Sequence, residues 1–324
     1  MAKWSRRSLL IGGLIAPLAA RAQQSWPSGP IRIIVPFPPG GSVDAIARLA
    51  QAGLTQRLGA TIVIENRTGA SGSTGAAVVA KSPPDGNTWL VVFDTHAVNP
   101  TLLPNLPFDS DKDLDPVTLI ATAPYVVARH PSRPYTDLAA LIRAAKAKPK
   151  SISYASVGSG SIGHLALELL GKQAGIDLIH VPYRGGGPAL NDAVAGHVDL
   201  IIASAALLLP QIVPGAIRPV VQMGAKRLAA LPDIPTIGEG GYPGAQANSW
   251  WGMFAPAGTP KPVVERFRTA LAESLREPRV AQQLTETQQM TLVLSDPEAL
   301  RTFAREQARI WGAVVRENNI KADE

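Results

Sequence analysis

Ile31-Arg-Ile-Ile-Val-Pro-Phe-Pro-Pro-Gly-Gly-Ser-Val-Asp44 is the stretch that decides the fold of this chain. Its first five residues form an apolar, β-branched run that predicts a buried strand. The prolines and glycines from Pro36 to Ser42 break this strand. From Asp44 to Leu58 the apolar residues then recur at helical spacing. A strand, a Gly-rich loop and a helix in this order are typical of a protein built on a parallel sheet.

The same unit recurs along the chain. Further strands are predicted at 61–65, 89–93, 125–128, 151–156, 177–182 and 200–203, and helices at 136–147, 162–173, 188–195, 260–276, 278–287 and 297–317. With 324 residues and an apolar share of 46%, the chain can bury two cores. We therefore expect an α/β protein of two lobes, each a mainly parallel sheet flanked by helices. Lobe 1 would comprise residues 23–125 and 227–324, and lobe 2 residues 126–226.

The first 22 residues are typical of a cleaved signal peptide. Lys3, Arg6 and Arg7 precede an apolar stretch of 12 residues, which is too short to span a bilayer, and Ala20-Arg-Ala22 offers a cleavage site. The pair Arg6-Arg7 fits a twin-arginine signal or a Sec signal that carries two arginines. Either signal predicts export to the periplasm.

The remaining composition excludes several function classes. Four of the 31 basic residues lie in the first 22 positions, which leaves 27 against 25 acidic residues, so the net charge of +6 does not indicate nucleic-acid binding. Cysteine is absent, and the five histidines lack metal-ligand spacing, so we expect no metal and no cofactor. Asp94 and His96 flank a strand end but have no nucleophile beside them in the sequence.

Four loops share one property: each follows a strand and opens a helix. They are residues 40–42, 69–75, 158–161 and 185–187. Ligands collect at the carboxyl ends of parallel strands, and helix N-termini there offer free N–H groups to an anion. An ordinary Gly-containing turn explains any one loop, but four together favour a shared anion-binding cleft. For Asp44 we favour a helix cap, and for His164 a half-buried helix position.

One of these loops permits a different interpretation. Gly158-Ser-Gly-Ser-Ile-Gly163 matches the G-x-G-x-x-G motif of dinucleotide sites. The acidic residue that this motif needs is missing, because the next strand ends in Pro182-Tyr-Arg184 and Asp177 stands at its beginning. An exported NAD(P)-dependent oxidoreductase therefore stays open as an alternative.

At these loops the sequence resembles the substrate-binding proteins of tripartite tricarboxylate transporters, the TctC family or Bug receptors. The matching residues extend over nearly the whole mature chain. They include Ile33-Ile-Val-Pro-Phe-Pro-Pro-Gly-Gly-Ser-Val-Asp44, Gly69-Ala-Ser-Gly72, Tyr154-Ala-Ser-Val-Gly158, Val181-Pro-Tyr-Arg-Gly185 and Leu231-Pro-Asp-Ile-Pro-Thr236.

The resemblance implies a type II periplasmic binding fold, a Venus flytrap without enzymatic activity that closes on a small organic acid. The expected ligand-binding residues come from both lobes: Phe37, Gly40, Gly41, Ser42, Asp44, Gly69, Ala70, Ser71, Gly72, Ser73, Thr95, Ser156, Gly158, Ser159, Gly160, Ser161, His164, Tyr183, Arg184, Ala203 and Ser204. Expected partners are one large and one small integral membrane transporter subunit, or a sensor kinase. We expect a monomer.

The chain departs from the family pattern after Val198-Asp-Leu200. Many family members place an acidic residue there, whereas this chain continues with Ile202-Ala-Ser-Ala-Ala206. An ammonium group on the ligand would find no counter-charge at this position. We therefore expect that amino acids are disfavoured and that a ligand with an uncharged distal end is preferred.

Overall fold

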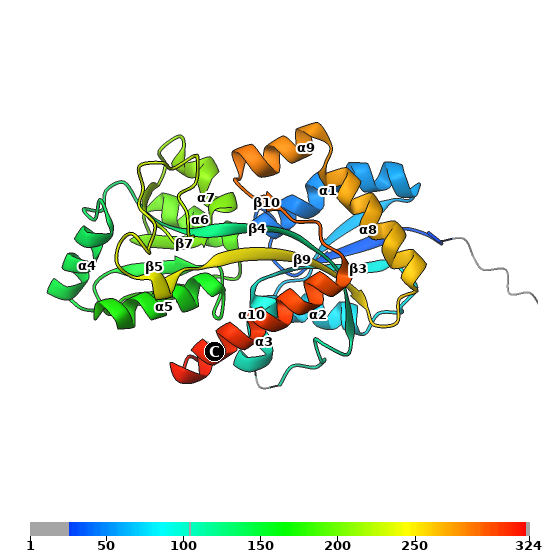
Figure 1. Cartoon of the computed structure of the whole chain (residues 1–324), viewed down its shortest axis with the longest axis horizontal. Coiled ribbons are helices and arrows are strands. Elements are labelled where there is room, and N and C mark those ends of the chain that lie inside the picture. The colour runs from blue at the N-terminus through cyan, green and yellow to red at the C-terminus, as the bar shows by residue number, and fades with distance from the viewer. Residues whose placement is uncertain (1–25, 104, 322–324) are drawn as a thin grey trace, which may run out of the picture.

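The computed structural model describes residues 26–103 and 105–321, which form two α/β halves joined by two long strands (Figure 1). The predicted signal peptide lies outside these residues. The first half contains β1 (Ile31–Val35), α1 (Ser42–Leu58), β2 (Ile62–Asn66), α2 (Ser73–Ala80), β3 (Thr88–Phe93) and α3 (Thr95–Leu102). β1 lies between β2 and β3 and is parallel to both. Its apolar residues are buried, as the predicted strand requires.

The second half repeats this plan. Its elements are α4 (Leu138–Ala147), β5 (Ser153–Ser156), α5 (Ile162–Ala174), β6 (Ile179–Pro182), α6 (Gly186–Ala195), β7 (Leu200–Ser204), α7 (Ala205–Ile212) and β8 (Arg218–Gln222). β5 lies between β6 and β7 and is parallel to both. Asp137 caps α4, because its side chain accepts the N–H of Ala140 at 2.7 Å. Parallel strands therefore direct their carboxyl ends, and the loops that follow, toward one edge in each half.

Two long strands belong to both halves. β4 (Leu114–Arg129) pairs with β9 (Asn248–Pro256) up to Pro124 and then with β7 and β8. β9 also pairs with β3, so the sheet order is β2-β1-β3-β9-β4-β7-β5-β6, with β8 and β10 (Thr291–Leu292) on β4. Figure 1 shows β4 and β9 side by side through the middle of the molecule, from one half into the other. The halves are therefore connected by hydrogen-bonded strands.

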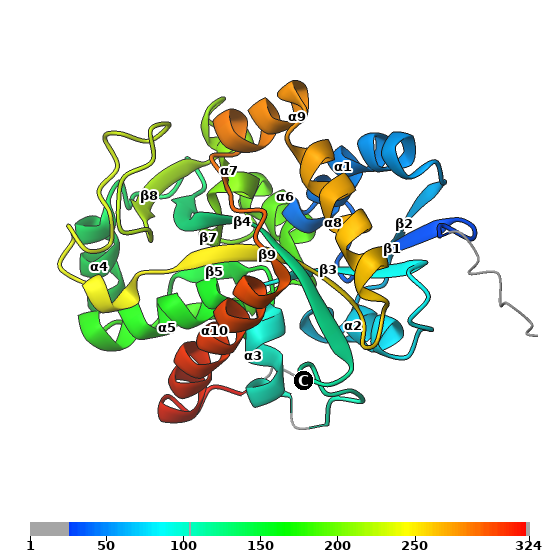
Figure 2. The same cartoon turned by 45° about the vertical axis from the view of Figure 1, so that its right-hand side comes forward.

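The last third of the chain covers the first half. α8 (Lys261–Leu275) and α10 (Pro297–Glu317) match the predicted helices, while α9 (Pro278–Gln282) continues as a π-helical segment at Gln283–Thr287. α8 packs against α1, and α10 packs beside α3 (Figure 2). The ring of Phe267 on α8 stacks on Trp89 of β3, with 3.8 Å between their centroids.

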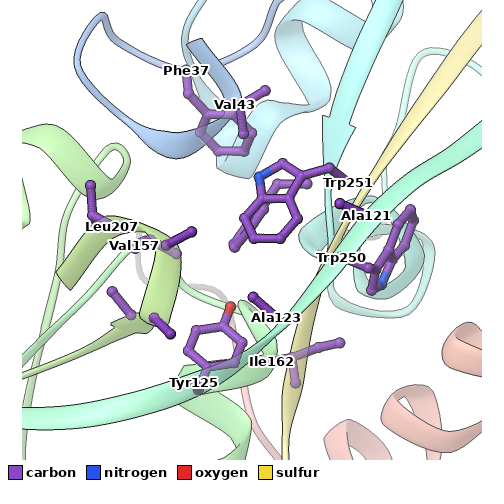
Figure 3. Close-up of a cluster of buried hydrophobic side chains, with 14 of the residues drawn as sticks. Phe37, Val43, Ala121, Ala123, Tyr125, Val157, Ile162, Leu207, Trp250 and Trp251 are labelled. Carbon is purple, nitrogen blue, oxygen red and sulfur yellow. The ribbon is translucent and has the colours of Figure 1, made fainter. Parts of the chain in front are cut away.

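The hydrophobic core is continuous between the halves. Figure 3 shows Trp251 between Phe37 and Tyr125, with Val157 and Leu207 approaching from the second half. Trp250 and Trp251 are 1% and 0% exposed, so both are packing residues. Packing thus holds the two halves against each other around the point where β4 changes partners.

The predicted lobe boundaries stay predictions, but the contacts bear on where the chain crosses between the halves. The first predicted crossing, near residue 125, coincides with the change of partners in β4 after Pro124. The second was predicted near residue 226. Residues 236–245 nevertheless contact the second half, because Thr236 bridges to Gln222 of β8 and the turn Pro243–Ala245 packs on α5. These contacts favour a crossing at the start of β9.

Candidate ligand-binding cleft

A cavity of about 410 Å³ lies where the loops of the two halves meet. Residues 36–37 and 69–72 with Leu103 line it from the first half, and residues 157–159 and 182–184 from the second. Two of the four predicted loops, 69–75 and 158–161, thus line the cavity directly, and a third, 185–187, is represented by the adjacent Arg184. The predicted residues that line this cavity are Phe37, Gly69, Ala70, Ser71, Gly72, Gly158, Ser159, Tyr183 and Arg184.

The other predicted residues lie around this cavity. Gly41, Ser42 and Ser204 line a small adjoining space, which residues 185–186 also reach, and Thr95 lines another. Eight predicted residues line none of the three spaces: Gly40, Asp44, Ser73, Ser156, Gly160, Ser161, His164 and Ala203. Several of these eight hold the lining loops in place.

The first loop is braced by Asp44. Its carboxylate accepts the Gly40 N–H at 3.1 Å, the Asn66 amide at 3.0 Å and the Arg48 guanidinium at 2.9 Å. Burial raises the pKa of Asp44, but these three hydrogen bonds outweigh it and hold the pKa below its ordinary value. The predicted cap is wrong, because the N-cap of α1 is Gly41 and no side chain caps it. Asp44 instead reaches back over the helix start to fix the loop.

The second loop bends through unusual backbone conformations. Ala70 and Ser71 have φ of +44° and +50°, in a region of backbone conformation that residues other than glycine rarely adopt. Two α3 side chains hold the Ser71 carbonyl there, Thr95 through its hydroxyl at 2.8 Å and Asn99 through its amide at 3.0 Å. Sequence reasoning missed Asn99. Its spacing of four from Thr95 becomes informative only when α3 is known.

The third loop, residues 158–161, is fixed by hydrogen bonds of Ser161 and His164, two residues that were predicted to bind the ligand. Ser161 caps α5 by accepting the His164 N–H at 3.3 Å. His164 Nδ1 in turn accepts the Gly160 N–H at 3.2 Å, and the His164 ring stacks on His180 at 3.9 Å. The predicted half-buried position is wrong, because His164 is 5% exposed. These contacts shape the loop that carries Gly158 and Ser159 into the cavity.

The last lining segment contains the cavity's one charged side chain. Arg184 is exposed on its wall, and none of the residues 26–103 and 105–321 forms an ion pair with its guanidinium. The neighbouring Tyr183 donates its hydroxyl to Asp192 at 2.6 Å. Burial and this hydrogen bond raise the pKa of Tyr183 to about 12, so the phenol stays neutral at physiological pH. Arg184 is therefore the group on this wall that can pair with an anion.

The cleft is closed in this structure. Ser71 of the first half donates its hydroxyl to the Ser159 carbonyl of the second at 2.8 Å. At the other end of the cleft the 38–41 loop meets residues 185–187 so closely that a Cβ on Gly187 would stand 3.0 Å from the Pro39 carbonyl oxygen. Backbone thus touches backbone at this point between the halves.

The glycines of the G-x-G-x-x-G segment are used for packing between the halves. A Cβ on Gly160 would collide with Leu102 of α3, and one on Gly163 would stand 2.6 Å from the Tyr125 ring. Side chains of the protein occupy the space where a dinucleotide would need close approach to this backbone. The packing therefore argues against the oxidoreductase alternative.

Three further observations concern the rest of the described chain. A second cavity of about 420 Å³ lies between α3, α10 and residues 106–111, but none of the four predicted loops lines it. Across residues 26–103 and 105–321 the structure has no cluster of His, Asp or Glu placed to hold a metal ion. In the same part of the chain, no helix combines the length and apolar character needed to span a membrane.

Comparison with known proteins agrees with this geometry. The model of the tripartite tricarboxylate transporter family receptors, TctC, matches residues 46–320. The periplasmic binding protein BugD superposes with a TM-score of 0.87 at 30% identity, over 92% of this chain and all of that one.

Two more solved structures have ligands named in their descriptions. Rpa4515 of R. palustris with adipate has a TM-score of 0.86 at 33% identity, over 91% of this chain and 99% of the other. MatC of Rhodopseudomonas palustris with bound malate has a TM-score of 0.83 at 32% identity, over 90% of this chain and all of the other.

These matches confirm the predicted α/β periplasmic binding fold and the predicted role as a solute-binding receptor instead of an enzyme. A cleft between two halves of a protein is also a common place for a small-molecule site. The chain belongs to the TctC family of tripartite tricarboxylate transporter receptors.

Proposed function

We propose that this receptor captures a small organic carboxylate in the cavity between its halves. The observation that carries the proposal is Arg184, which lines one cavity together with the Gly-rich loops 69–72 and 158–159 and has no ion-pair partner among residues 26–103 and 105–321. α2 and α5 begin directly after these loops, so their partial positive charges favour an anion as well. The relatives bound to adipate and malate support the same class of ligand.

Binding and closure would occur together. A carboxylate replaces water at the loops of one half, and Ser159, Tyr183 and Arg184 complete its surroundings when the other half closes. The closed state is favoured only by contacts that the open state lacks. The closed receptor would then be recognised by the integral membrane subunits of a tripartite transporter.

The walls of the cavity bear on the ligand's distal end. Phe37, Leu103 and Val157 are apolar, and Arg184 is the one charged residue of the lining. β7 ends at Ala203 and Ser204 without an acidic side chain. We therefore expect that an ammonium group on the ligand weakens binding and that carboxylates with an uncharged or apolar distal end are preferred.

Location and assembly belong to the same proposal. Residues 1–22 would direct export to the periplasm and be removed there. The receptor would act as a monomer that meets one large and one small membrane subunit. Whether the signal is of the Sec or the twin-arginine type is decided by fusing residues 1–22 to a reporter and testing export in strains that lack either pathway.

The experiment that tests the ligand class combines native mass spectrometry with thermal unfolding. Mature protein purified without added ligand is weighed first, and unfolding is then followed with mono- and dicarboxylates, amino acids and NAD(P). A carboxylate at a hundredfold excess over its Kd should stabilise the protein by about 2.7 kcal/mol. At the same ligand concentration Arg184→Gln should lose about half of this stabilisation, while Arg143→Gln, at an exposed position of α4, should keep it. A response to nucleotides with none to any carboxylate would contradict the proposal.

A further inference from the structure

Asp94 occupies the junction between the two halves. It follows β3 of the first half directly, is 0% exposed and lies outside the cavity lining. One carboxyl oxygen accepts the Tyr125 hydroxyl at 2.6 Å, and the other accepts the Ile162 N–H at 3.4 Å. Tyr125 is the residue at which β4 begins to pair with β7, and Ile162 begins α5. A single carboxyl group therefore connects both halves at the strand that joins them.

The surroundings of Asp94 are closed by packing. Gly163, next to Ile162, lies so near the Tyr125 ring that a Cβ there would stand 2.6 Å from it. The Phe93 ring packs edge-on against Tyr125 and at a tilt against Trp251. Separating α5 from the first half would remove the Ile162 N–H from the carboxyl and admit water in its place.

We propose that Asp94 is a proton-dependent latch, whose carboxyl takes up a proton as the halves close and releases it as they open. This inference rests on the proposed function in one respect, namely that ligand binding and closure occur together. Asp94 does not touch the cavity, so it acts as a positioning residue. Its influence on affinity would arise from the equilibrium between open and closed states.

The physical reason is that, among residues 26–103 and 105–321, no positively charged side chain acts on the buried carboxyl. Burial raises the pKa of Asp94 to about 8, although hydrogen bonds from Tyr125, Ile162 and Thr95 oppose this rise. His96, on α3, cannot supply a counter-charge, because burial lowers its pKa to about 4. α5 has His164 in its first turn, and Nδ1 of this histidine accepts the Gly160 N–H. In an open state, with water at the carboxyl, the pKa returns toward its ordinary value of 3.8.

The sign of the effect follows from this difference. The closed state binds the proton more tightly, so closure is favoured at low pH. Between about pH 4 and pH 8 each unit of rising pH should weaken closure by up to tenfold, and above pH 8 the effect should end. Ligand affinity should therefore fall as the pH rises from 5.5 to 8.

The first test needs no ligand. The sequence contains no cysteine, so Lys81→Cys and Asn191→Cys, at exposed positions of the two halves, allow specific attachment of two spin labels. Distances between the labels are measured by double electron-electron resonance at pH 5.5 and pH 8. Lowering the pH should shift the distribution toward the distance of the closed structure. Asp94→Asn, which mimics the protonated carboxyl, should show the closed distribution at both pH values, and Asp233→Asn, an exposed control, should behave like the parent protein.

The second test measures protons directly. Calorimetric titration of a bound carboxylate in buffers of different ionisation enthalpy should show uptake approaching one proton per ligand at pH 6.5, and none in Asp94→Asn. Asp94→Asn should bind more tightly than the parent at both pH values, and this advantage should be at least tenfold larger at pH 8 than at pH 5.5. Tyr125→Phe keeps the carboxyl and loses a hydrogen bond that favours its ionised form, so the pH dependence should persist and extend upward.

The outcomes separate the two proposals. Equal pH dependence in the parent and Asp94→Asn would overturn the latch, and so would weaker binding of Asp94→Asn at every pH, which indicates a structural role alone. Failure of every carboxylate to bind would contradict the proposed function, while the spin-label distances would still decide about Asp94.

Discussion

Gly187 offers a substitution that should weaken ligand binding without weakening the fold. It lies in the first turn of α6 and faces the 38–41 loop of the other half, and a Cβ added there would stand 3.0 Å from the Pro39 carbonyl oxygen and 3.6 Å from Gly40 C. The first distance is shorter than ordinary van der Waals contact, and both atoms belong to backbone, so the halves could not close fully. Gly187→Ala therefore opposes the closed state specifically.

The magnitude follows from known costs of overpacking. Excess volume in a packed contact costs about 1–3 kcal/mol, which corresponds to roughly a 5- to 150-fold increase in Kd. Alanine also favours the helix over glycine by up to about 1 kcal/mol. The same substitution should thus leave the free energy of unfolding of the ligand-free protein unchanged or slightly raised.

The assay compares two quantities in each variant. Calorimetric titration with a stabilising carboxylate gives Kd, and urea unfolding without ligand gives the free energy of unfolding. Gly29→Ala is the matched control, since a Cβ at Gly29 meets nothing within 4 Å. An unchanged Kd in Gly187→Ala would refute the argument that the two backbones meet in the ligand-bound state. A parallel loss of stability would show that the contact belongs to the fold itself.

Three further predictions test the site and its support. Arg184→Gln should raise the Kd for a carboxylate roughly tenfold, because a hydrogen bond to a charged group contributes about 1.5 kcal/mol or more, and calorimetric titration measures it. Asp44→Asn should lower the free energy of unfolding at pH 7 by about 1–3 kcal/mol. Because the pKa of Asp44 is depressed in the folded protein, its stabilising contribution is present above about pH 4 and is lost below. The free energy of unfolding should therefore fall less steeply with decreasing pH in the variant than in the parent. Phe267→Ala removes the fully buried ring that stacks on Trp89 and should cost about 3–5 kcal/mol in urea unfolding, with little change in Kd.

The repeating strand, loop and helix pattern was predictable because parallel strands are buried on both faces and bear apolar β-branched runs. Ile31–Val35 and Leu200–Ser204 are of this kind, and both were predicted within one or two residues. α3 and α7 were not predicted, since Pro100 and Pro210 lie inside them and proline ordinarily ends a helix. Tertiary packing of α3 against α10 overrides this local preference.

The connecting strands escaped prediction for a related reason. β4 contains Pro116 and Pro124, and proline normally argues against a central strand. The structure accommodates Pro116 at a register shift against β9, between Pro116 and Thr118. Only the part of β4 after Pro124 has the uninterrupted apolar pattern that predicts a strand, which is why residues 125–128 alone were recognised.

The candidate site was predictable as a set of loops and only partly as a set of contacts. Strand order places the four loops at one cleft by a general rule. Which residues face the cavity depends on neighbours that are distant in sequence. His164 accepts a hydrogen bond from Gly160, and Asp44 accepts one from Asn66. Ser71 donates a hydrogen bond to Ser159 of the other half. Nothing in the local pattern of these residues specifies such partners.

The strand β4 has a consequence for how the molecule comes apart. Its first part is hydrogen-bonded to β9 and its last part to β7 and β8, and the buried core is continuous between the halves. If one half unfolds, the part of β4 that was paired in that half loses its hydrogen-bond partners, and the core of the other half becomes exposed at the junction. Denaturation should therefore proceed as one cooperative transition, in which neither half survives as an independently folded fragment after the other has melted.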